Sequence, residues 1–150
     1  MDITDQEKIE NILYKLKSDN NITQMKQYVQ HGRVSTYEHC ERVARFCYLI
    51  NKRFGLNADV ETLLIGAMLH DFYLYDWHDK DDTHKWHGYH HADTALANAI
   101  RYFEVNEEIQ HIIWCHMWPL NISRFPKTKE ARIVCFADKC CSIVETFCKR

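Results

Sequence analysis

Two adjacent residues with metal-binding side chains, His70 and Asp71, are the most informative chemical feature of this chain. Eight of the ten histidines lie between His70 and His116, and a ninth, His39, precedes the pair. An imidazole nitrogen and a carboxylate oxygen can bind one cation together, and the second carboxylate oxygen is then available to a neighbouring cation. The pair therefore suggests a metal site whose other ligands must come from elsewhere in the chain.

Four polar residues interrupt apolar helical faces in the pattern expected of such a site. His39 shares a face with Val43, His70 follows apolar residues at helical spacing, His116 ends an isoleucine-rich stretch, and Asp138 stands four residues after an apolar position. A buried carboxylate without a partner would cost several kcal/mol. One cation held by imidazoles would explain several of these residues.

The elements that position these residues are predicted to be helices. Only four glycines and two prolines occur, and no segment alternates β-branched with polar residues. We therefore expect an all-α fold, a compact single-domain bundle of about six to seven helices. Apolar spacing predicts helices over about 5–17, 22–30, 36–53, 58–71, 89–102, 106–116 and 126–150, with a long loop over 75–88. The expected capping or first-turn residues are Thr4 or Asp5, Ser35 or Thr36, Asn57 and Pro126.

Length and composition indicate one domain. A chain of 150 residues with 46% hydrophobic content can bury one ordinary core, so we expect a single domain over 1–150. Its core should span about 30–145, with the helix at 5–17 packed on it. The formal charge of −2 provides no basic surplus for binding long nucleic acid.

The sequence also carries expectations about location and cysteine chemistry. The first seven residues are polar and acidic, and no apolar run approaches the roughly 20 residues that span a bilayer. We therefore expect a cytoplasmic protein with no membrane partner. Seven cysteines without a Cys-x-x-Cys pair predict reduced thiols, most of them small core residues.

The order of these residues resembles the HD superfamily of metal-dependent phosphohydrolases, an all-helical family. Residues 35–44 (STYEHCERVA) resemble the segment with the family's first histidine, and 64–71 (LIGAMLHD) the segment that names it. Residues 91–95 (HADTA) resemble the segment with the third histidine, and 134–139 (VCFADK) the terminal aspartate motif. The resemblance covers roughly residues 30 to 145.

The resemblance implies a set of metal ligands. His39, His70, Asp71 and Asp138 would hold a first metal, and Asp71 would bridge to a second metal held by His91 and His116. One or two divalent ions (Mn, Fe or Mg) are implied, with a metal-activated water attacking phosphorus. The implied substrate is a small phosphorylated metabolite, a nucleotide among the candidates, and both phosphomonoesterase and phosphodiesterase activity stay open.

Two features of the family's signalling phosphodiesterases are missing. The lysine that follows their His-Asp pair is replaced here by the segment 72–75 (FYLY), and Gly88-Tyr89 is not followed by proline. Cyclic-dinucleotide hydrolysis is thereby disfavoured, and the chain resembles a small stand-alone member.

Several alternatives stay open. The same ligand set resembles that of superfamily members that use a di-iron pair as an oxygenase, and a non-catalytic metal-stabilised binding module is a third possibility.

The roles of several single residues also stay open. His87 could be an alternative ligand, a residue supporting a ligand from behind, or a surface residue. Lys85 and Arg124 are the candidates for binding a substrate phosphate. For the remaining polar and aromatic residues we expect solvated histidines at 31, 78, 84, 90 and 111, tryptophans that pack loops onto the core, and a solvated acidic loop at 76–82. Oligomeric state stays open.

Overall fold

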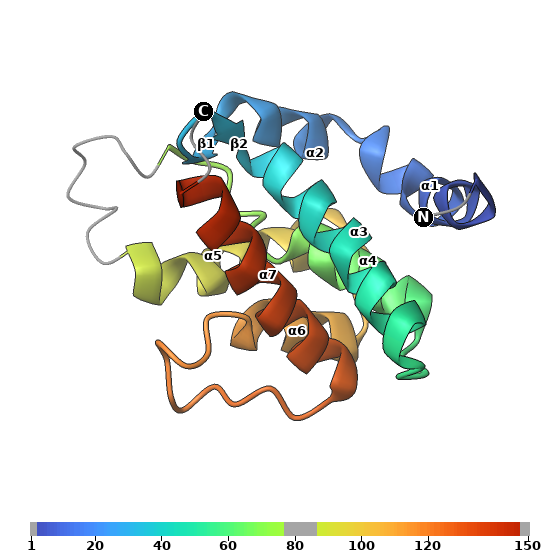
Figure 1. Cartoon of the computed structure of the whole chain (residues 1–150). Helices are drawn as coiled ribbons and strands as arrows, with labels where there is room; N and C mark the ends of the chain where they lie inside the picture. Colours follow the sequence, from blue (N-terminus) through green and yellow to red (C-terminus); the bar gives the residue numbers. More distant parts are fainter. Residues whose placement is uncertain (1–2, 77–86, 148–150) are drawn as a thin grey trace.

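The computed structural model describes residues 3–76 and 87–147 of the chain (Figure 1). Helices dominate these residues, which confirms the predicted all-α class, and the one small sheet pairs β1 with β2. The elements in order are α1 (Ile3–Lys17), α2 (Asn20–Gln24), the short 3-10 helix η1 (Met25–Gln27), β1 (Val29–His31), β2 (Val34–Ser35), α3 (Thr36–Phe54), α4 (Val60–Leu69), α5 (His87–Tyr102), α6 (Glu107–Cys115) and α7 (Lys129–Phe147).

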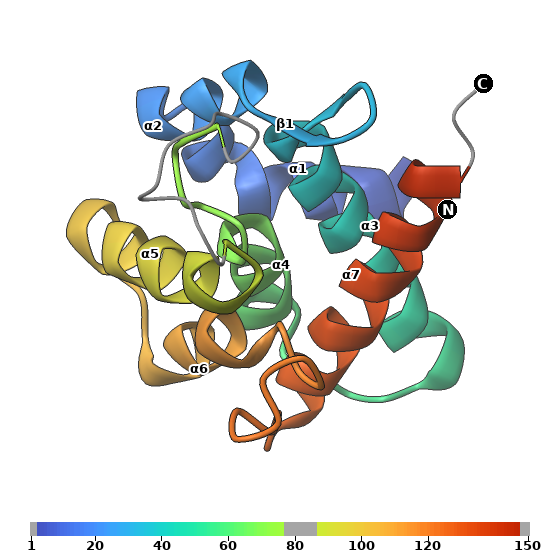
Figure 2. The same ribbon diagram turned by 90° about the vertical axis from the view of Figure 1, so that its left-hand side faces the viewer.

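Helix α4 forms the centre of the molecule. Its sequence is apolar almost all round, as expected of a helix that neighbours cover on several sides. It packs against α1, α3, α6 and α7, and Figure 2 shows it between α3 on one side and the pair α5 and α6 on the other. Because α4 ends at Leu69, its carboxyl end delivers His70 and Asp71 into the middle of the fold.

Close packing of α4 on α6 depends on Gly66. A β-carbon at this position would lie only 2.7 Å from Cδ1 of Ile112 and 3.0 Å from its Cγ2, closer than side chains normally approach. Gly66 stands four residues before His70, and Ile112 stands four residues before His116. The contact therefore lies one helical turn before both histidines and sets the distance between them.

Local capping explains where α3 and α6 begin. Ser35 accepts a hydrogen bond from the Glu38 amide while the Glu38 side chain accepts from the Ser35 amide, a reciprocal capping box. Asn106 caps α6 by accepting from the Ile109 amide. At the other end of α3, Gly55 adopts φ 58°, the left-handed conformation that glycine tolerates best. The predicted starts of these two helices are confirmed.

Other predicted boundaries were wrong. Asp59 rather than Asn57 caps α4. Asn57 precedes the helix and adopts φ 53°, not the extended backbone conformation of a capping residue. Thr4 and Asp5 lie inside α1 instead of capping it. The final helix starts at Lys129, so Pro126 precedes it rather than occupying its first turn.

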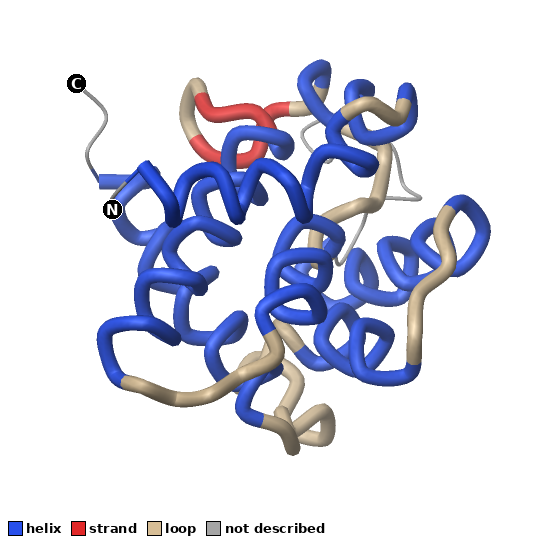
Figure 3. Tube along the Cα trace, turned by 90° about the vertical axis from the view of Figure 1, so that its right-hand side faces the viewer, coloured by secondary structure: helices blue, strands red, loops and turns tan. Residues whose placement is uncertain are grey.

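The predicted helix over 22–30 was wrong in its second half. Asp19 caps α2, which ends at Gln24 and is followed by η1 and by an antiparallel hairpin of β1 and β2 (Figure 3). Gly32, at φ 63°, permits the tight turn of that hairpin. The hairpin places residues 29–31 beside the start of α3 and near the end of α7.

None of the helices within residues 3–76 and 87–147 has the combined length and apolar character that crossing a membrane requires.

Candidate metal centre

Six buried side chains from separate parts of the chain converge at the end of α4. None is more than 6% exposed. Three histidines and the two aspartates were predicted from helical faces or from the His-Asp pair, and the fourth histidine from the family resemblance. They are His39 on α3, His70 and Asp71 directly after α4, His91 on α5, His116 directly after α6, and Asp138 on α7.

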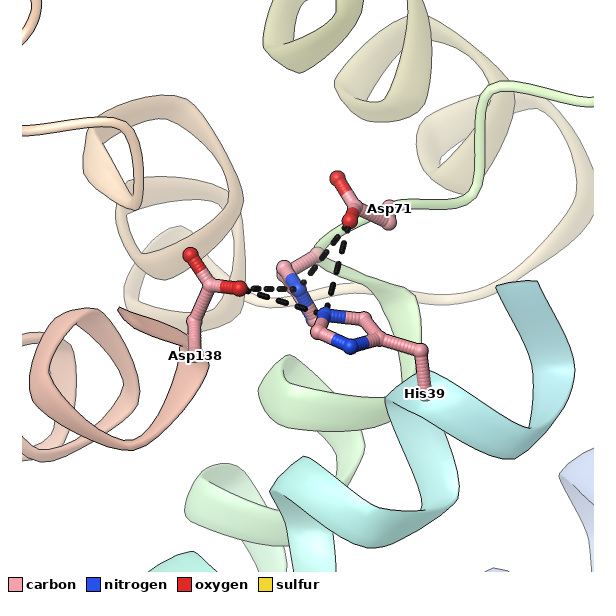
Figure 4. Close-up of side chains that lie close together, drawn as sticks. His39, Asp71 and Asp138 are labelled. Carbon is pink, nitrogen blue, oxygen red and sulfur yellow. Dashed lines mark hydrogen bonds and ion pairs between the residues drawn. The ribbon is translucent and has the colours of Figure 1, made fainter. Parts of the chain in front are cut away.

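Four of these residues form a first group. His39 Nε2 lies 3.1 Å from Asp138 Oδ1, and His70 Nε2 lies 3.6 Å from the same oxygen. His70 Nε2 is also 3.3 Å from Asp71 Oδ2. Figure 4 shows His39, Asp71 and Asp138 pointing toward one another from three different segments. One ligand atom from each of the four side chains lies within 4.8 Å of the others, which is close enough to surround a single ion.

Asp71 joins this group to a second one. Its other oxygen, Oδ1, lies 3.2 Å from His91 Nε2 and 3.3 Å from His116 Nε2, and the two imidazole nitrogens are 2.9 Å apart. The two oxygens of one carboxylate thus face two different sets of histidines. This is the arrangement expected of a carboxylate that bridges two cations.

Hydrogen bonds to the backbone fix which ring nitrogens can bind a cation. His70 Nδ1 lies 2.7 Å from the Ala67 carbonyl, and His116 Nδ1 lies 2.7 Å from the Ile113 carbonyl. Because a carbonyl only accepts, both Nδ1 atoms must carry the proton, and in the neutral ring the Nε2 lone pair then faces the centre.

Two buried atoms at the centre have no hydrogen-bond partner among the described residues, namely His70 Nε2 and Asp71 Oδ1. Buried polar atoms without partners are uncommon because each costs desolvation energy. Nitrogen lone pairs and carboxylate oxygens that converge on one point would repel one another without a positive charge between them. The donor set therefore fits divalent metal ions.

The buried aspartates and histidines of the centre shift one another's pKa values. Burial would raise the pKa of Asp71 and Asp138, but the neighbouring histidines hold the pKa of both carboxyls well below its usual range. Burial would lower the pKa of His39, but hydrogen bonds with Asp138 and Glu145 raise it to about 10. Both aspartates are therefore ionised near neutral pH, as metal ligands must be.

Glu145 supports the centre and was not predicted from the sequence. Its Oε2 accepts a hydrogen bond from His39 Nδ1 at 2.8 Å, and its Oε1 accepts one from Arg42 at 2.6 Å. A carboxylate on the far nitrogen of a histidine orients the ring and makes it a stronger ligand. A signal was present, because Glu145 lies seven residues after Asp138 and shares the buried stripe of the last helix.

Gln30 supports Asp71 in a similar way. Its Nε2 donates to Asp71 Oδ2 at 2.6 Å, and its Oε1 accepts hydrogen bonds from Tyr73 and Thr36. The sequence offered no signal for this residue, because the hairpin that carries it was predicted to be helix.

A cavity of about 700 Å³ opens beside the centre. Asp71, His91 and Asp138 form part of its wall. Lys139 also lines this cavity, and its ammonium donates to the His116 carbonyl at 2.6 Å and lies 3.4 Å from Asp138 Oδ2. His31, expected to be solvated, also lines the cavity and is only partly exposed.

Arg124 lies away from the cavity lining. Its guanidinium forms an ion pair with Asp93 at 2.8 Å and lies over the Trp114 ring at 5.1 Å. His87 begins α5, and its side chain is outside the described structure, as are Lys85 and the loop residues at 77–86. The expectations for His78, His84, Trp77, Trp86 and the acidic residues after Asp76 also lie outside the described residues.

Comparison with known proteins gives one match. No curated protein and no solved structure matches the chain significantly. The family model described as HD domain matches residues 36–143, a segment that contains all six side chains of the centre. Because the match spans well over half of the sequence, this chain belongs to the HD domain family.

Proposed function

We propose that this protein is a phosphohydrolase that cleaves the ester bond of a small phosphorylated molecule at a centre of one or two divalent metal ions. Membership of the HD domain family and the buried histidine and aspartate cluster indicate a function of the metal-dependent hydrolase type. The observation that carries the proposal is Asp71, whose two oxygens face two separate sets of histidines.

The chain would offer one set of side chains to each ion, with Asp71 common to both sets. His39, His70, Asp71 and Asp138 would hold the first, and Asp71, His91 and His116 the second. Divalent ions bound there would supply Lewis acidity, which lowers the pKa of water and stabilises negative charge on a phosphoryl group. Mixed imidazole and carboxylate ligands suit Mn or Fe better than Mg, which prefers oxygen ligands.

The remaining residues would bind the substrate and retain the geometry of the centre. Lys139 stands at the cavity wall, where its positive charge would attract a phosphate oxygen. Glu145 and Gln30 would hold His39 and Asp71 in place through the turnover. In the overall reaction the oxygen of one water bonds to phosphorus, the ester P–O bond breaks, and the alcohol departs with a proton.

The test begins with protein purified without added metal. Elemental analysis should find Mn or Fe, and the metal-loaded protein should release 4-nitrophenol and phosphate from 4-nitrophenyl phosphate in anaerobic buffer. Asp71→Ala should lose both metal and turnover, whereas His90→Ala, a change at an exposed neighbour on α5, should retain both.

Two other outcomes would each overturn the proposal. The imidazole-rich donor set also suits iron, so bound iron with oxygen uptake and no phosphate release would assign a di-iron oxygenase instead. Metal that raises thermal stability without turnover of any phosphate monoester or diester would assign a metal-stabilised binding module. Near-complete retention of metal by Asp71→Ala would contradict the ligand assignment itself.

A further inference from the structure

A second hollow continues from the cavity beside the metal centre. It encloses about 480 Å³ between the segment 118–126 and the outer side of α7, and it shares Pro119 and Lys139 with the first cavity. Figure 2 shows this segment looping beside the amino-terminal half of α7. Both volumes fall within the range of roughly 300–1,000 Å³ typical of small-molecule sites.

The second hollow is lined mainly by apolar side chains. Trp118 and Phe125 form one wall, with ring centroids 5.4 Å apart in an edge-to-face arrangement. Phe136 and Ile143 on α7 form the other wall and are 59% and 58% exposed. Large apolar side chains this exposed beside a cavity indicate a surface whose burial by a bound ligand would be favourable.

Charge is arranged asymmetrically along the two hollows. The candidate metal centre lies at one end and Lys139 lies where the two hollows meet, so an anion would bind between them. From Lys139 outward the described lining is aromatic and aliphatic, with Cys135, Cys140 and a single further cation, Arg132, beside Phe125. A ligand that matches this pattern has an anionic head and an apolar body.

We propose that the substrate is a phosphate ester whose organic part is an elongated apolar group, alkyl or aromatic. The phosphate would lie at the metal centre beside Lys139, and the apolar group would extend across Pro119 into the groove formed by Trp118, Phe136 and Ile143. This inference rests on the proposed phosphohydrolase function and narrows it.

A polar substrate fits the groove less well. The hydroxyls of a sugar would leave water for a surface on which the described side chains offer few hydrogen-bonding partners, and each unpaired hydroxyl would cost free energy. An alkyl chain gains about fourfold in affinity for every methylene that is fully buried. The same groove therefore selects for apolar substrates and against sugar phosphates.

Binding can be measured without turnover by using phosphonates, whose P–C bond is not an ester. Methylphosphonate, octylphosphonate and a nucleoside phosphonate would be titrated calorimetrically into the metal-loaded full chain. We expect octylphosphonate to bind about 50-fold more tightly than methylphosphonate, the gain from burying roughly three methylenes. Equal affinity for the two, or tighter binding of the nucleoside phosphonate, would overturn the inference even if phosphate esters are hydrolysed.

Variants locate the effect. Phe136→Ser and Ile143→Ser should each reduce the ratio of octylphosphonate to methylphosphonate affinity several-fold, and Lys139→Gln should weaken both ligands. Ile100→Ser is the matched control, because Ile100 is 53% exposed on α5 away from the groove and its loss should leave the ratio unchanged.

Two further outcomes have defined meanings. If the wild-type protein is a dimer and Phe136→Ser converts it to a monomer, the groove binds a second copy of the chain and the inference is overturned. Chain-length-dependent binding without any ester turnover would support the groove assignment while the hydrolase proposal fails.

Discussion

At the scale of single residues, side chains behind the candidate metal centre hold its members in place. Glu145 has a fully buried side chain, and its two oxygens bind His39 and Arg42. We predict that Glu145→Gln lowers metal affinity about 10- to 100-fold, because His39 loses the anionic partner that strengthens it as a ligand. The measurement is a competition titration with a chelator of known affinity.

Arg42→Gln provides the control for that variant. The Arg42 side chain is 49% exposed, so its ion pair with Glu145 is screened by solvent and contributes less to His39. A smaller change in metal affinity than in Glu145→Gln is therefore expected. Equal affinities for Glu145→Gln and the unmodified protein would show that the buried carboxylate does not act on the metal.

The six converging side chains were easier to predict from the sequence than the residues that support them. His39, His116 and Asp138 could be found because each is a polar residue on an otherwise apolar helical face. Glu145 lies on such a face too and could have been found in the same way. Gln30 could not, since its contact with Asp71 depends on a three-residue strand, and so short an element leaves no periodicity to detect.

At the scale of elements, the close approach of α4 to α6 positions His70 relative to His116 in the candidate metal centre. We predict that Gly66→Ala destabilises the fold by about 1–3 kcal/mol through overpacking against Ile112. Helix propensity alone would make the alanine variant more stable by about 1 kcal/mol. A net loss of stability would therefore be due to crowding of the added methyl group against Ile112. Urea unfolding measures the change in the free energy of unfolding.

A second substitution tests the cause of that loss. Ile112→Val removes Cδ1, the atom nearest to the added methyl group. The double variant Gly66→Ala with Ile112→Val should therefore be less destabilised than the sum of the two single variants. Additive losses would place the crowding elsewhere.

The ion pairs between α1 and α3 predict a pH dependence. Hydrogen bonds from Lys17 hold the pKa of Glu10 below 4.5, and those from Lys17 and Arg45 outweigh burial to lower the pKa of Glu41. A lowered carboxyl pKa adds stability above pH 4.5 that is lost as pH falls through the lower value. Glu41→Gln should thus cost up to about 1 kcal/mol at pH 7 and less at pH 3, as judged by urea unfolding. A loss of equal size at both pH values would attribute the effect to packing.

Element boundaries show why the fold was only partly predictable. Helices α3 and α6 begin at side chains that cap them through local hydrogen bonds, and such local rules are visible in sequence. The region between α2 and α3 is decided instead by tertiary contacts. There Thr36 donates to the Tyr28 carbonyl and Gln30 reaches Asp71, and these contacts hold a hairpin where periodicity favoured helix.

At the scale of the whole molecule, the candidate metal centre is built from the same helices as the hydrophobic core. The six side chains come from α3, α5 and α7 and from the ends of α4 and α6, so an ion bound among them links most of the core helices. Among the described residues the charges of the two aspartates are offset by the neighbouring imidazoles, by a hydrogen bond from Gln30 and by the Lys139 ammonium, yet two buried polar atoms have no hydrogen-bond partner. Binding of metal should therefore stabilise the entire fold rather than one local segment.

Removal of metal tests whether metal binding stabilises the entire fold. An ion that binds only the folded state adds about 2.7 kcal/mol when present at 100 times its Kd. For a domain of this size each kcal/mol raises Tm by about 2–4 °C. We predict that a chelator lowers Tm by about 5–10 °C in differential scanning calorimetry, that Mn²⁺ restores it, and that Asp71→Ala shows neither effect. His90→Ala should respond as the unmodified protein does. If the chelator leaves the Tm of the metal-loaded protein unchanged, metal binding does not contribute to the stability of the core.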